Sequence, residues 1–157
     1  MKEIRINSKE YEDLMLNYNR LVQRHDVSPR IMKIETLSSL KNISQENDRF
    51  VYSNSLKDIN ALAHISYYSA EKGLDPNNTY ECLFDDLQKD NDKYIAINSI
   101  ESFKKGRGKE LIERIFEKDD IKGIFLVPKN PSVGDYYSRI GFNYINNESD
   151  VMYLGKN

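Results

Sequence analysis

The stretch IESFKKGRGKELIERI, residues 100–115, limits most strongly what this chain can fold into. It begins with the last residues of Lys93–Ser102, an apolar and β-branched segment that predicts a buried central strand. Its last residues belong to 109–118, where apolar side chains at helical spacing predict an amphipathic helix. Gly106 and Gly108 lie at the junction, where they permit a tight turn. The stretch therefore predicts a strand that passes through a glycine turn into a helix.

Four cations accompany these glycines, namely Lys104, Lys105, Arg107 and Lys109. The first amides of a helix have no acceptor within the helix, and the helix dipole adds positive potential there. The turn therefore predicts a site for a phosphate-bearing anion, although an ordinary turn with solvated lysines would have the same residues. The pattern is not a Walker loop, because the GxxxxGK[ST] spacing is absent. It is not a dinucleotide fingerprint either, because Leu111 replaces the third glycine.

The remaining chain alternates between strand and helix patterns. We expect strands at 2–7, 49–53, 59–69 and 123–128, and a final hairpin at 142–146 and 150–155. We expect helices at 8–22, 28–40, within 80–87 and at 131–141, the first two beginning at a serine cap. No repeat or linker interrupts them. The fold class is therefore α/β (an α+β mixed sheet), in a single domain spanning 1–157.

Composition and charge argue against several classes of function. The formal net charge of −2 argues against nucleic acid as the main partner. No apolar run approaches membrane-spanning length and MKEIRINSKE has no signal-peptide core, so we expect no membrane association. A single cysteine, Cys82, excludes an internal disulfide and fits a reducing cytoplasm. The chain has only two histidines, His25 and His64, beside this cysteine, which is too few side chains for a zinc site, so we expect no metal.

A second motif, KNPSVGDYYSRIGF, follows the predicted strand at 123–128. Together with the glycine turn, it resembles the GNAT superfamily of acyl-CoA-dependent N-acetyltransferases. That family has a [Q/R]xxGx[G/A] loop, which matches residues 103–108, and later an asparagine and a YxxxGF segment, which match Asn130 and residues 137–142. The resemblance runs from Tyr94 to Leu154. It implies a GNAT-like fold with a central mixed β-sheet and helices on both faces.

The resemblance implies acetyl-CoA as co-substrate. Its pyrophosphate would lie on the loop and its pantetheine along the strand before it. The residues implied to bind it are Ser99, Ile100, Lys104, Lys105, Gly106, Arg107, Gly108, Lys109 and Asn130. The loop departs from the family pattern at its first position, where Phe103 replaces Gln or Arg. Because the phosphate contacts in this loop come mostly from backbone amides, binding can survive the loss of that side-chain contact.

The reaction that the resemblance implies is direct attack of a primary amine on the thioester carbonyl. A backbone N–H near Ile100 would polarise that carbonyl, and Tyr137 would protonate the leaving thiolate. Tyr137 could instead be a core aromatic residue. Glu101 is a candidate general base or an ordinary solvent-facing strand residue. His64 is a second candidate base or a hydrogen-bonded structural residue.

Several alternatives stay open. Cys82 could act as a nucleophile, although no histidine lies at a telling spacing. The acidic run at 85–92 could attract a cationic acceptor or form a solvated face. The chain could bind CoA without turnover, as a sensor or interaction module, or bind nucleic acid through its basic loop. The acceptor amine could belong to a small molecule or to a protein, and a homodimer is compatible with the sequence.

Overall fold

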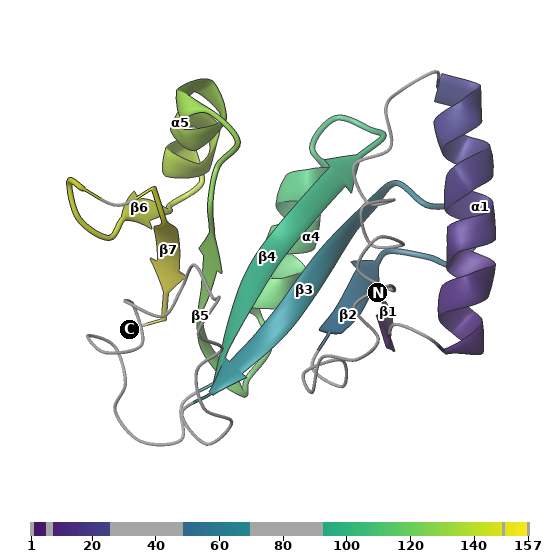
Figure 1. Cartoon of the computed structure of the whole chain (residues 1–157), viewed down its shortest axis with the longest axis horizontal. Helices are drawn as coiled ribbons and strands as arrows, with labels where there is room; N and C mark the ends of the chain where they lie inside the picture. The colour runs from purple at the N-terminus through teal and green to yellow at the C-terminus, as the bar shows by residue number, and fades with distance from the viewer. Residues whose placement is uncertain (1, 6–7, 26–48, 70–92, 149, 157) are drawn as a thin grey trace. The chain divides into compact units, whose positions relative to one another are not determined.

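The structure is a computed structural model that describes residues 2–5, 8–25, 49–69, 93–148 and 150–156 (Figure 1). Its elements, in chain order, are β1 (Lys2–Arg5), α1 (Lys9–His25), β2 (Arg49–Ser53), β3 (Ala61–Ser69), β4 (Lys93–Ser102), α4 (Arg107–Phe116), β5 (Ile121–Leu126), α5 (Pro131–Arg139), β6 (Asn143–Tyr144) and β7 (Met152–Gly155). The helices expected at 28–40 and 80–87, Cys82 and the acidic run at 85–92 lie outside the described residues.

The strands form one mixed sheet in the order β1-β2-β3-β4-β5-β7-β6. β1 with β2, β2 with β3, β5 with β7, and β6 with β7 pair antiparallel. β4 and β5 are neighbours in the sheet, and α4 joins them along the chain, which is a βαβ arrangement. The mixed α/β fold class and the adjacency of the two apolar strands are thereby confirmed.

The chain divides into two compact units, and β4 contributes to both. The first unit comprises Met1–Ser66 and Ile97–Glu117, and the second comprises Tyr67–Ala96 and Lys118–Asn157. That residues 1–157 form a single domain stays a prediction. Within the ranges that the structure describes, no helix is both long and apolar enough to cross a membrane.

In the first unit, α4 lies behind the strands in the view of Figure 1, and α1 lies beside them. Ser8 caps α1 by accepting a hydrogen bond from the Tyr11 amide at 3.1 Å, as the sequence predicts. The apolar stripe of α1 packs with Leu62 of β3 in one buried cluster. The preceding residue, Ala61, lies on the other face of β3 and lines a pocket with Leu111 of α4. Helices on both faces of the sheet are thus confirmed for this unit.

The second unit has its own core between β4, β5 and β7. Tyr94, Phe125 and Tyr153 form an aromatic group in which Phe125 and Tyr153 stack with ring centroids 4.6 Å apart. Tyr153 also covers Gly123, where an added Cβ would lie 2.3 Å from the tyrosine ring. No side chain larger than hydrogen fits there unless the ring moves. The close packing of β5 against β7 therefore depends on this glycine.

The residue types at the two ends of α5 favour a helix start and a helix end at these positions. Asn130 is the N-cap, and its Oδ1 accepts a hydrogen bond from the Val133 amide at 3.0 Å. Pro131 follows at the first helical position, where a missing N–H costs no helical hydrogen bond. Gly141 then takes a φ of 109°, in a region that favours glycine, so the chain leaves the helix sharply.

Candidate active site

The junction between β4 and α4 differs in one respect from the sequence prediction. α4 begins at Arg107, two residues before the expected start at Lys109, so Gly108 lies inside the first turn. Gly106 is the N-cap, with φ 81° and ψ −13° in the left-handed region. It has no side chain, and none from the described residues caps this helix. The Arg107 amide donates to a carbonyl within the loop, and the Gly108 and Lys109 amides, which have no side-chain cap among the described residues, are left for an external acceptor.

Local hydrogen bonds hold this loop in place. Ser102 Oγ donates to the Lys104 carbonyl at 2.7 Å, and the Arg107 amide donates to the same carbonyl at 3.2 Å. The Phe103 amide donates to the Asn60 carbonyl at 2.8 Å. A Cβ added at Gly108 would lie 3.4 Å from Ser102 Cβ, in ordinary contact. The glycine turn is thus fixed to the end of β4 and to the β2–β3 connection.

The charge at the loop is smaller than the four cations suggest. Arg107 forms an ion pair with Glu110 at 2.5 Å, and Lys109 Nζ lies 3.6 Å from Glu113. Lys104 and Lys105 are exposed, and no carboxylate of the described residues pairs with either. Two cations of the loop are therefore already partly neutralised, and two remain available to attract an anion.

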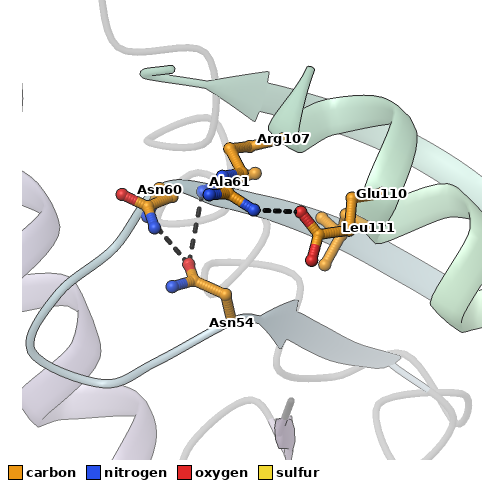
Figure 2. A pocket seen from close by; sticks show the side chains of 6 residues that line it. All are labelled: Asn54, Asn60, Ala61, Arg107, Glu110 and Leu111. Carbon is orange, nitrogen blue, oxygen red and sulfur yellow. Dashed lines mark hydrogen bonds and ion pairs between the residues drawn. The ribbon is translucent and has the colours of Figure 1, made fainter. Parts of the chain in front are cut away.

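A pocket of about 200 Å³ lies beside this loop (Figure 2). Asn54 and Asn60 line it from the β2–β3 connection and Ala61 from the start of β3, while Arg107 and Glu110 line it from α4. Asn54 Oδ1 accepts hydrogen bonds from the Asn60 amide at 2.7 Å and the Ala61 amide at 3.3 Å. The wall opposite the Arg107–Glu110 pair is therefore made rigid by one asparagine.

The regular alternation of β4 breaks just before the loop. Asn98 Nδ2 donates to Ser66 Oγ at 2.7 Å, and Ser66 lies on the α1 face of β3 with Leu62. Glu101, three residues later, also reaches the α1 face, whereas a regular strand would turn it to the other side. Such a break is typical of a β-bulge, which leaves backbone groups unpaired. It falls at Ser99 and Ile100, which the sequence resemblance implies lie along pantetheine.

Glu101 is buried, with only 6% of its surface exposed. Its Oε2 accepts a hydrogen bond from the Tyr18 hydroxyl at 2.5 Å, and Tyr18 of α1 is fully buried. The alternative that Glu101 is a solvent-facing strand residue is therefore wrong. The sequence pattern placed Tyr18 on the inner face of α1 but gave no signal for this pairing.

Phe103 packs inward against the α1 cluster. Its ring meets the ring of Tyr18 edge-on, with centroids 6.1 Å apart. The first residue of the loop is thus an apolar anchor at the position where the family pattern has Gln or Arg.

The second unit carries two further predicted site residues, one at the N-cap of α5 and one within that helix. Asn130 is exposed, and its Oδ1 is occupied as the helix cap, which leaves its Nδ2 as a donor. Tyr137 in the last full turn is 8% exposed and packs edge-on against Phe142 at 5.6 Å. Tyr136 beside it is 38% exposed and meets the Tyr137 ring edge-on at 5.3 Å, so the more exposed of the two faces elsewhere, as the sequence predicts.

Of the remaining candidates, His64 is buried on β3 in the first unit. Cys82 lies outside the described residues. Within those residues, no group of three or more His, Cys, Asp or Glu side chains is arranged to hold a metal ion. The chemistry that the described residues offer is that of an uncapped helix start beside a buried carboxylate. Both features lie where the end of β4 meets α4 in the mixed α/β fold.

Comparisons with solved structures identify the fold. The chain matches AtaT complexed with acetyl-methionyl-tRNAfMet at 12% identity, over 85% of this chain and 86% of that chain, with a TM-score of 0.53. It matches NAA60 of Arabidopsis thaliana in complex with a bisubstrate analogue at 15% identity, over 99% of both chains, with a TM-score of 0.53. No protein-family model and no curated protein matches the chain. The protein therefore has the fold of the GNAT acetyltransferases.

Proposed function

We propose that this protein is an acyl-CoA-dependent N-acyltransferase that moves an acetyl group from acetyl-CoA to a primary amine. One observation carries the proposal: β4 of a GNAT fold runs into a helix whose first-turn amides have no side-chain cap among the described residues. Gly106 is in the left-handed conformation there, so the amides can point together at a pyrophosphate. Lys104 and Lys105 add attraction for a polyanion.

The proposed chemistry divides between named residues. The bulge of β4 at Ser99 and Ile100 would offer a backbone N–H to the thioester carbonyl, which stabilises the developing oxyanion. Tyr137 would give its phenolic proton to the thiolate of CoA as it leaves. Glu101 would take a proton from the attacking ammonium. Asn130 would contribute its Nδ2 donor to CoA while its Oδ1 caps α5.

The test uses a panel of acceptor amines from several chemical classes. AtaT was solved with acetyl-methionyl-tRNA, so an aminoacyl-tRNA belongs in the acceptor panel beside alkylamines and a peptide with a free N-terminus. Release of free CoA thiol is measured for each acceptor, and the acetylated product is identified by its mass. Turnover with any of them supports the proposal. Binding of acetyl-CoA without turnover of any acceptor would favour the alternative of a CoA-binding module.

One observation favours that alternative. Phe103 replaces the polar residue that opens the loop in the family and is anchored in the α1 cluster. The loop therefore has one contact fewer for phosphate, so tight substrate binding rests on the backbone amides. If acetyl-CoA neither binds nor reacts, both forms of the proposal are wrong.

A further inference from the structure

Glu101 is placed unlike an ordinary strand carboxylate. It is buried, it lies next to the loop at the end of β4, and it accepts a hydrogen bond from the hydroxyl of Tyr18. No Lys, Arg or His side chain of the described residues pairs with it. Burying a carboxylate without a cation is costly, and a site with this cost commonly serves a function. An ammonium group from a ligand would supply the missing charge.

Tyr18 determines how Glu101 can meet such a ligand. The hydroxyl of Tyr18 donates to Oε2 at 2.5 Å, so this oxygen is occupied and the carboxylate plane is held. The Tyr18 ring is fully buried and meets the ring of Phe103 edge-on, which holds it in place. The second oxygen, Oε1, is thus presented in one orientation. A carboxylate held this way can accept a hydrogen bond from a cation with little loss of side-chain entropy.

We propose that Tyr18 is a positioning residue that orients Glu101 to bind the ammonium group of the acceptor and take its proton. This inference rests on the proposed function and names the residues that would set acceptor chemistry. Glu101 is the group that would touch the acceptor, and Tyr18 acts through it. The acceptor class is an alkylamine that is cationic at neutral pH, because an uncharged amine would gain nothing from a buried carboxylate.

One N–H proton moves from the ammonium to Glu101, and the neutral amine attacks the thioester carbon to form the C–N bond. The C–S bond then breaks, and the thiolate takes the phenolic proton of Tyr137. The second nitrogen proton returns to that phenolate through solvent, and Glu101 releases its proton to solvent. One acetyl group is transferred and one proton is released for each turnover.

The test compares Tyr18→Phe, Glu101→Gln and the double variant with the parent protein. Tyr11→Phe is the matched control, because Tyr11 is a buried tyrosine on the same helix and in the same cluster. Two acceptors are used, an alkylamine that the parent acetylates and an arylamine that is uncharged at neutral pH. Binding of acetyl-CoA and the melting temperature are measured for every variant.

We expect Tyr18→Phe to lower kcat/KM for the alkylamine roughly 10-fold, because a hydrogen bond to a charged group is lost. We expect Glu101→Gln to lower it roughly 100-fold. The double variant should be no worse than Glu101→Gln, since Tyr18 acts only through Glu101. Rates with the arylamine, and every rate of Tyr11→Phe, should stay near those of the parent.

Four results would overturn the inference. Additive effects in the double variant, or equal losses with both acceptors, would assign Tyr18 a merely structural role. A loss of acetyl-CoA binding in Tyr18→Phe would do the same. Unchanged alkylamine kinetics in both single variants would remove Glu101 from the reaction while leaving acyl transfer intact. Failure of the parent to acetylate any amine is a separate outcome, which overturns the proposed function and this inference with it.

Discussion

Gly106 offers a sharp test of the loop, because its backbone is in a conformation that other residues adopt at a cost. Its φ is 81°, and a Cβ added there would meet no atom within 4 Å. Replacement by alanine therefore adds no clash with neighbouring residues, and its whole cost comes from the left-handed backbone. We expect Gly106→Ala to lower the free energy of unfolding by about 1 kcal/mol. For a chain of this length, the melting temperature should fall by roughly 2–4 °C.

The same substitution sets an upper limit on the effect on binding. If the alanine variant relaxes to another loop conformation, acetyl-CoA must restore the left-handed one, and about 1 kcal/mol corresponds to roughly a 5-fold weaker affinity. Gly106→Asn is the matched variant, since asparagine tolerates this conformation better and should lose less on both counts. Thermal unfolding and calorimetric titration measure the two effects. Equal stability and affinity in glycine, alanine and asparagine forms would refute the reasoning.

Three further predictions concern neighbouring features. Acetyl-CoA affinity should weaken modestly as salt rises, because Arg107 and Lys109 already pair with carboxylates. Mainly Lys104 and Lys105 would respond to screening. Titrations at two salt concentrations measure the effect, and a constant affinity would assign binding to the backbone alone. Tyr137→Phe should lower kcat roughly 10- to 100-fold with little change in acetyl-CoA affinity, because the ring and its packing remain; an unchanged kcat where chemistry limits the rate would make Tyr137 a core residue. Asn130→Ala should lower the free energy of unfolding by about 1 kcal/mol through loss of the cap, whereas Asn130→Ser should keep most of that stability. If the serine variant also keeps full acetyl-CoA affinity, the Asn130 amide makes no contact with the cofactor.

The elements that the sequence predicts well are those with strong local signals. The β-branched run of β4 coincides with the predicted strand at both ends, and Ser8 caps α1 as its type indicates. Gly141 ends the α5 region, as a glycine after a helical pattern predicts. Each of these signals lies within a few residues of the structure that it determines.

The features that the sequence could not predict depend on distant partners or on backbone angles. The burial of Glu101 depends on Tyr18, which is 83 residues away along the chain. The early start of α4 depends on which of two glycines takes a positive φ, and the residue types at Gly106 and Gly108 do not distinguish them. The proline after Asn130 is a local signal for a cap at that position, whereas the family pattern predicts a ligand role for the same residue.

The most direct test of the account is calorimetric titration of acetyl-CoA into the parent protein and into Gly108→Asp. The aspartate would place a carboxylate in the first turn of α4, against the proposed pyrophosphate. Gln23→Glu on an exposed position of α1 adds the same charge on the opposite face of the first unit and serves as the control. We predict that the parent and the control bind alike and that Gly108→Asp binds roughly 10-fold more weakly or worse. A parent that does not bind acetyl-CoA, or an aspartate variant that binds as well as the parent, would contradict the account.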